Sequence, residues 1–268
     1  MKTQSSSGEV ALPEAAPVTG RLLRLEIVLV LALSLGASAA YAVVDIVRQV
    51  LVAIETHRAL SAQTTTLAPS LDIHPYIDLA YQLLGVATQL APVLLVAYLL
   101  YRSGESLKTL GVDASRPRQD LVFGAALALL VGSVGLALLV GSHAAGFSLT
   151  IAIGESRHYW WTVPMLILSA AGSGISEEII VGAYLLHRLD QLGWAKWTAL
   201  IAAAVLRGAY HLYQGFGSFF ANMVLGLFFG IIFQRTKRAM PMLIAHFLID
   251  AVAFVGYLEL KGHLSWLP

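Results

Sequence analysis

The sequence predicts an all-α, polytopic integral membrane protein with about seven transmembrane helices and a cytoplasmic N-terminus. Of its 268 residues, 57% are hydrophobic and only 12% are charged, whereas soluble domains have roughly 45–50% apolar and 25% charged residues. The apolar residues form several runs of about 20 residues, the length that crosses a bilayer as a helix. Lys and Arg residues are divided unequally between the segments that join these runs. That asymmetry sets the orientation of a membrane protein.

The composition also excludes several function classes. A net charge of +1 argues against a nucleic-acid partner, which would require a basic patch or stripe. The chain has no cysteine, so disulfides, thiolate catalysis and cysteine-ligated metals are ruled out. The partner that remains is the lipid bilayer.

The first apolar run lies at about 25–44, after a polar stretch over 1–20 that we expect to be a disordered cytoplasmic tail. A basic start, an apolar middle and Ala40-Tyr41-Ala42 also resemble a cleavable secretory signal. We favour an uncleaved first helix because the rest of the chain is itself polytopic. Residues 21–268 are then one membrane domain.

The later spans follow at regular intervals. Residues 45–75 begin as an amphipathic continuation of the first helix and end in a loop rich in Thr, Ser and Pro. The other helices are expected at about 77–101, 121–140, 162–189, 197–213, 216–234 and 240–258. With this division, 12 of the 17 Lys and Arg residues lie on the side of the N-terminus and four on the other. The excess indicates a cytoplasmic N-terminus.

Two adjacent acids, Glu177 and Glu178, interrupt the apolar run of the fourth helix. An ionised group in hydrocarbon is costly, so such acids face protein or water and usually serve a function. Gly174 and Gly182 lie one turn before and after Glu178, which lets a neighbouring helix approach it. Two close carboxylates suit general acid or base chemistry. The alternative is a structural ion pair.

Three further polar features lie in the later helices. Arg207 and His211 are four residues apart in the fifth helix, and we expect Arg207 to compensate one glutamate. Asn222 in the sixth helix has the type of side chain that hydrogen-bonds a substrate or a neighbouring helix, and we expect the neighbouring helix. His246 and Asp250 are also four residues apart, a spacing at which a carboxylate fixes the orientation of an imidazole.

Taken together, these residues resemble the CPBP family of CAAX-protease and bacteriocin-processing membrane proteins, which includes the type II CAAX prenyl endopeptidases. The resemblance covers about 163–257, within a catalytic region of about 159–258. The family motif Glu-Glu-x-x-x-Arg reads Glu177-Glu178-Ile-Ile-Val-Gly182 here. Its Phe-x-x-x-His motif reads Arg207-Gly-Ala-Tyr-His211, and His-x-x-x-Asn/Asp is complete as His246-Phe-Leu-Ile-Asp250. Gly182 thus replaces the family Arg and Arg207 the family Phe. We expect Arg207 to supply the lost charge from the fifth helix.

The resemblance implies an endopeptidase that hydrolyses a peptide bond of a membrane-associated peptide or protein, in a bacterial cell membrane. A glutamate, chiefly Glu177, would deprotonate a water, and His246 with Asp250 would stabilise the oxyanion. His211 would assist the water or bind metal. One divalent metal such as zinc, held by Glu177, His211 and His246, fits the usual ligand types. A metal-free mechanism is equally consistent.

One geometric condition must hold for these residues to share a site. In ideal helices His211 lies roughly 20 Å from the start of its helix and His246 about 9 Å into its own, at 1.5 Å per residue. Helix tilt or displacement must bring them to one level. Two other functions remain open: a non-catalytic membrane interaction or peptide-immunity protein, and an ion-coupled carrier. The carrier is the weaker of the two, because inverted repeats and broken helices are not evident.

Overall fold

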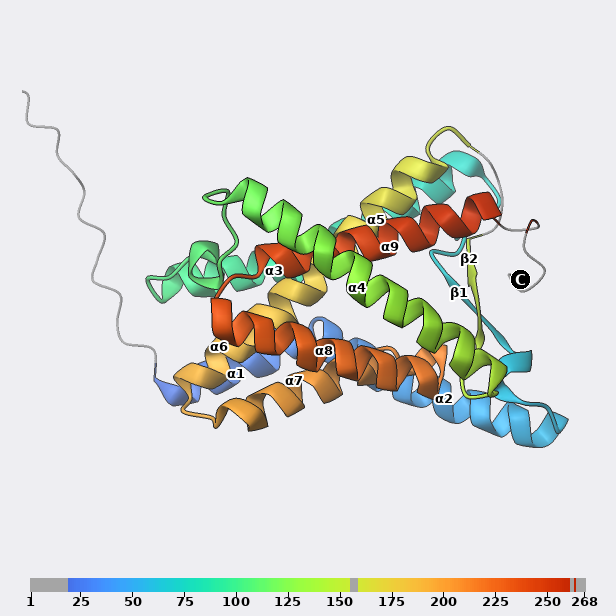
Figure 1. Ribbon diagram of the computed structural model, residues 1–268, viewed down its shortest axis with the longest axis horizontal. Coiled ribbons are helices and arrows are strands. Elements are labelled where there is room, and N and C mark those ends of the chain that lie inside the picture. The colour runs from blue at the N-terminus through green and yellow to red at the C-terminus, as the bar shows by residue number, and fades with distance from the viewer. Residues whose placement is uncertain (1–18, 155–158, 261–262, 264–268) are drawn as a thin grey trace, which may run out of the picture.

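The computed structural model describes residues 19–154, 159–260 and 263, and these form a helical bundle (Figure 1). The helices are α1 Gly20–Ala32, α2 Leu35–Thr56, α3 Pro75–Arg102, α4 Pro117–Ala144, α5 Thr162–Glu177, α6 Leu186–Gln191, α7 Lys196–Tyr210, α8 Phe216–Thr236 and α9 Met240–Leu260. A π-helical segment, η3 (Glu178–Leu185), joins α5 to α6. Short 3-10 turns are η1 Leu60–Ala62, η2 Leu107–Leu110 and η4 Leu212–Gln214. The all-α polytopic class is confirmed. Of the tail predicted over 1–20, residues 1–18 lie outside the described residues, and Gly20 begins α1.

The helix predicted over 25–44 is two helices, α1 and α2, separated at Leu33 and Ser34. The Ser34 hydroxyl donates to the carbonyl of Val30, a local bond that competes with the helical ladder. Gly36 permits the sharp turn, because a Cβ there would lie 2.7 Å from the Leu31 carbonyl oxygen. The second helix then continues to Thr56, well beyond the predicted boundary.

In the described part of the chain, six helical units are long and apolar enough to cross a membrane: α2, α3, α4, the continuous unit Thr162–Gln191, α8 and α9. The helix predicted over 197–213 is α7, which has 15 residues. At 1.5 Å per residue it is about 22 Å long, less than the ~30 Å hydrocarbon core. It packs closely on α8, where a Cβ at Gly208 would lie 2.7 Å from the Phe219 carbonyl oxygen. α7 is therefore shorter than the candidate spans, although Trp197, Ile201 and Val205 on its outer face are exposed.

A small parallel sheet lies at the end of the bundle opposite α1 and α6 (Figure 1). Strand β1 (Thr64–Leu67) pairs with β2 (Thr150–Ile153), with Thr64 opposite Thr150 and Leu67 opposite Ile153. The sequence predicts only a loop at 64–67. The strands are rich in the β-branched residues Thr and Ile, which fit a pleated surface.

The predicted basic side of the membrane coincides with the end of the bundle formed by α1, α6 and the turn between α8 and α9 (Figure 1). There Arg238 donates to Asp120 at 2.5 and 2.6 Å and to Asp113 at 3.1 Å, which ties the start of α4 to this turn. Hydrogen bonds from Ser115, and then the Arg238 guanidinium, lower the pKa of the Asp113 carboxyl. Arg157 and Lys261, both counted on the other side, lie outside the described residues.

A second ionic cluster anchors α6 at the same end. Arg188 is fully buried and donates to Glu105 Oε2 at 2.6 Å, while Glu26 Oε2 lies 3.4 Å away. Burial acts to raise the pKa of Glu105, but the hydrogen bond from His187 and the charge of Arg188 outweigh it and lower that pKa. Because α6 continues the helix that carries Glu177, this cluster also fixes the far end of that helix.

Candidate active site

The two acids lie where the fourth predicted helix changes from α to π geometry. Glu177 is the last residue of α5 and Glu178 the first of η3. Single π turns inside α-helices occur frequently at functional sites. The Glu178 side chain is 1% exposed and that of Glu177 is 10% exposed. Carboxylates buried this deeply require compensating partners.

Arg207 from α7 supplies the compensating charge. Its Nη1 donates to Glu178 Oε1 at 2.6 Å, and its Nη2 lies 3.2 Å from His246 Nδ1 and 3.6 Å from Glu177 Oε2. The guanidinium carbon is also 5.7 Å from the ring centroid of Phe229, within cation–π range. One cation therefore contacts both acids and a histidine of α9.

Two glycines make room for this arrangement. A Cβ at Gly182 would lie 2.7 Å from Glu178 Oε2, so the carboxylate folds over the position where the family motif has Arg. A Cβ at Gly226 of α8 would lie 3.0 Å from Arg207 Cδ. The side chains of Glu178 and Arg207 thus occupy space that larger residues would take.

His246 joins the acid pair from α9. Its Nδ1 lies 2.9 Å from Glu178 Oε1, and its Nε2 lies 3.4 Å from Asp250 Oδ2. The imidazole is thereby held between two carboxylates, which fixes its ring orientation. On α5, a Cβ at Gly174 would lie 3.6 Å from His246 Cβ, so this glycine allows α9 to approach.

Glu177 faces a second set of partners at the end of α7. Tyr210 donates its hydroxyl to Glu177 Oε2 at 2.8 Å. His211 Nε2 lies 3.5 Å from the same oxygen, but it has no hydrogen-bond partner among the described residues. Gln214 Nε2 lies 3.4 Å from the other ring nitrogen of His211. The contacts of Tyr210 and His211 both use Glu177 Oε2 rather than Oε1.

The predicted residues therefore converge, with one exception. Glu177, Glu178, Arg207, His211, His246 and Asp250 form one connected cluster. His211 and His246 lie at a similar depth in the bundle, because His211 lies against Glu177 and His246 against the adjacent Glu178. Asn222 instead donates to the Ser218 carbonyl of its own helix at 3.0 Å, and not to the neighbouring helix that we expected.

Sequence reasoning missed Tyr210 and Gln214 as members of the site. Both flank His211 in the chain, and Tyr210 is buried. A buried tyrosine normally finds a partner for its hydroxyl, so its position beside a candidate histidine was the available signal.

The residues as placed do not fit a resident metal. In the described residues, no three His, Asp or Glu side chains come close enough together to hold a metal ion. Of the proposed ligands, Glu177 and His211 lie 3.5 Å apart, whereas His246 contacts Glu178 and Asp250 instead. The Arg207 guanidinium lies against both acids and His246, and a second cation there would be repelled.

A comparison with known families finds one match. Residues 159–252 match the family model described as type II CAAX prenyl endopeptidase Rce1-like. Over this region the chain is similar to that family. The matched segment contains every member of the cluster, and α1 to α4 lie outside it. No curated protein and no solved structure matches the chain.

Proposed function

We propose that this Rce1-like chain is an intramembrane endopeptidase that hydrolyses a peptide bond in or beside the membrane with a water activated by Glu177. The observation that carries the proposal is the convergence of two carboxylates, two histidines and Asp250 from separate helices. Each of these side chains is costly at membrane depth unless it is used or paired.

The contacts favour Glu177 over Glu178 as the base. Glu178 Oε1 is held by Arg207 and His246, and its Oε2 is buried beside Gly182. Glu177 is the more exposed of the two. Glu178 and Arg207 then form a fixed ion pair that holds the buried side of the site in place.

The proposed reaction uses these side chains in two steps. Glu177 takes a proton from the water, and the water oxygen attacks the carbonyl carbon of the substrate. His246, oriented by Asp250, stabilises the negative charge that develops on the carbonyl oxygen. Glu177 then gives its proton to the departing amine as the carbon–nitrogen bond breaks. His211 assists in placing the water.

A non-catalytic interaction or peptide-immunity protein is the second candidate. The observation that favours it is the loss of the family Arg at Gly182, together with the engagement of both His246 nitrogens by carboxylates. In that case the cluster is a structural core and Glu177 has no water to activate.

The test is cleavage of a membrane-peptide library by purified protein, with and without a chelator. Glu177→Gln and His246→Ala are expected to abolish cleavage, whereas Glu259→Gln, an exposed acid near the end of α9, is expected to retain it. The chelator is expected to have no effect. Absence of cleavage by folded wild-type protein would favour the interaction protein.

A further inference from the structure

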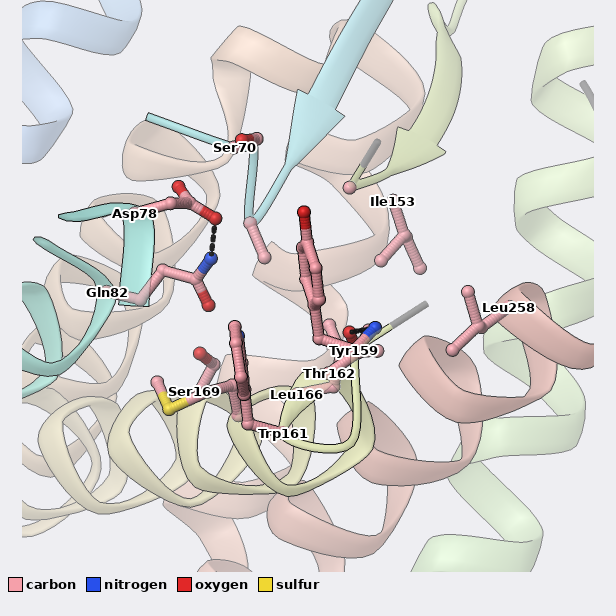
Figure 2. A pocket seen from close by; sticks show the side chains of 13 residues that line it. Ser70, Asp78, Gln82, Ile153, Tyr159, Trp161, Thr162, Leu166, Ser169 and Leu258 are labelled. Atoms are coloured by element: carbon pink, nitrogen blue, oxygen red, sulfur yellow. Dashed lines mark hydrogen bonds between the residues drawn. The ribbon is translucent and has the colours of Figure 1, made fainter. Parts of the chain in front are cut away.

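A cavity lies at the end of the bundle that carries the sheet, between α3, α5, α9 and β2 (Figure 2). Counted as space open to the centre of a water molecule, its volume is about 50 Å³, whereas one water needs ~10–15 Å³. Asp78 and Gln82 form part of its wall, with Gln82 donating to Asp78 at 2.7 Å. The cavity therefore has both the room and the polar groups that hold water.

A row of polar side chains leads from this cavity to the acid pair. Ser169 lines the cavity, and Ser173 and Glu177 follow at intervals of four residues. Residues with this spacing lie on one face of a helix. From Ser169 to Glu177 the helix rises about 12 Å.

The facing helix α3 continues the polar row. Gln89 Nε2 donates to Ser173 Oγ at 3.3 Å, and Gln89 is exposed although it lies in the middle of a candidate span. A Cβ at Gly172 would lie 2.9 Å from Gln89 Oε1, so the glycine keeps this amide in the seam. Uncharged polar groups at membrane depth are stable when protein or water satisfies them.

The other seam from the cavity to the site is closed by apolar side chains. Between α5 and α9, the buried residues Leu166, Ala170, Phe254 and Tyr257 form one cluster with Ile153. The α3–α5 seam has a shorter apolar constriction, where Val86 packs with Met165 and Trp161. Methionine adapts its shape readily, so Met165 can make way for water at this constriction.

We propose that the α3–α5 seam is a water path that connects the sheet end of the bundle to Glu177. Water enters the cavity beside Asp78, passes Val86 and Met165, and reaches the acid along Ser169 and Ser173. The role of this water in hydrolysis rests on the proposed function; the path itself does not.

The absence of native cysteine allows a direct test with single-cysteine variants. Ser169→Cys and Ser173→Cys in proteoliposomes are treated with silver ion in chloride-free buffer, and protection from later alkylation is measured. Silver ion is small and charged, so it follows water and not lipid. Ile167→Cys and Leu168→Cys are the controls, because these side chains are 41% and 38% exposed on the same helix and would face lipid.

We expect both serine positions to react at least ten-fold faster than the controls when silver ion is added to the face that carries the sheet. Gly172→Leu is expected to slow Ser173→Cys ten-fold and to leave Ser169→Cys unchanged. A reactive Ser169→Cys with an unreactive Ser173→Cys would overturn the proposal, because the cavity would then end at Val86. So would a Ser173→Cys that reacts only from the opposite face.

An activity measurement separates this proposal from the proposed function. If both hold, Gly172→Leu lowers kcat for peptide cleavage in the same proportion as it slows labelling of Ser173→Cys. If wild-type protein cleaves nothing but both cysteines react, the path stands and the protease does not. The smaller substitution Gly172→Ala is expected to slow labelling of Ser173→Cys, though less than leucine does, and to leave Ser169→Cys unchanged. Size-exclusion elution and thermal melting show whether each variant is folded.

Discussion

Replacing Arg207 by leucine tests the central ion pair of the site. The arginine is 1% exposed and lies 2.6 Å from Glu178, which is equally buried. Removing one partner of a buried ion pair typically costs about 3–5 kcal/mol, because the remaining charge loses its compensation. Glu178 Oε2 already has no hydrogen-bond partner in the described structure. We therefore expect Arg207→Leu to lower the free energy of unfolding by about 3–5 kcal/mol.

The measurement is a denaturant titration in mixed micelles, followed by tryptophan fluorescence. The matched control is Arg102→Leu, whose side chain is 42% exposed and pairs with Glu26. Glu26 is only 4% exposed, but it retains the Arg188 guanidinium 3.4 Å away as a second cation, so we expect a smaller loss than for Arg207→Leu. The double variant Arg207→Leu/Glu178→Leu removes both charges, so it is expected to recover most of the loss.

A loss for Arg207→Leu no larger than that for Arg102→Leu would refute the reasoning. It would mean that water or a shifted side chain compensates Glu178 as well as the guanidinium does. A double variant less stable than Arg207→Leu alone would show instead that Glu178 has stabilising partners other than Arg207.

Three further predictions concern the same fold. Gly182→Arg combined with Arg207→Phe restores the family pattern and is expected to retain peptide cleavage, whereas Arg207→Phe alone loses it. Equal loss in both variants would contradict the hypothesis that Arg207 replaces the positive charge of the family Arg. Gly226→Leu is expected to displace Arg207 and reduce cleavage at least ten-fold. Gly135→Leu, at a glycine where a Cβ would meet no packed atom within 4 Å, is expected to leave cleavage unchanged, and equal effects of the two variants would contradict the packing argument. The pKa of Asp113 is lowered by folding, so its contribution to stability is complete above its unfolded pKa of about 4 and declines as the pH falls below it. Thermal melts from pH 6 to 3 are expected to show a steeper decline for wild type than for Asp113→Asn, and parallel curves would exclude the effect.

Hydrophobicity predicts most of the architecture, because spans are long apolar runs and their order follows from the sequence. Their number does not, since seven spans were predicted and six helical units in the described residues are long and apolar enough to cross a membrane. The break at Ser34 was not predicted, since it depends on a bond to the Val30 carbonyl and on the close turn at Gly36. The sheet was not predicted either. Its strands lie far apart in the chain, and four-residue segments carry too little pattern to identify a partner.

The members of the site were predictable as polar residues within apolar helices, and so were the compensation of a glutamate by Arg207 and the pairing of His246 with Asp250. The contact of His246 with the same Glu178 oxygen that Arg207 holds was not, because it depends on how α7, α8 and α9 pack around Gly226 and Gly174. The position of Tyr210 on Glu177 likewise follows from the end of α7. Sequence thus identifies the charged groups, and packing determines which of them meet.

The π segment η3 sets the rotational phase between the two ends of one long helix. Glu177 lies at one end of the segment, and the buried Arg188 lies just past the other. In an α-helix, one residue more or fewer turns everything beyond it by about 100°. A single deletion within 179–185 would therefore turn either the acid pair or Arg188 away from its partners. The length of this segment is as tightly constrained as the identity of the acids, and homologous chains that share both clusters should share its residue count.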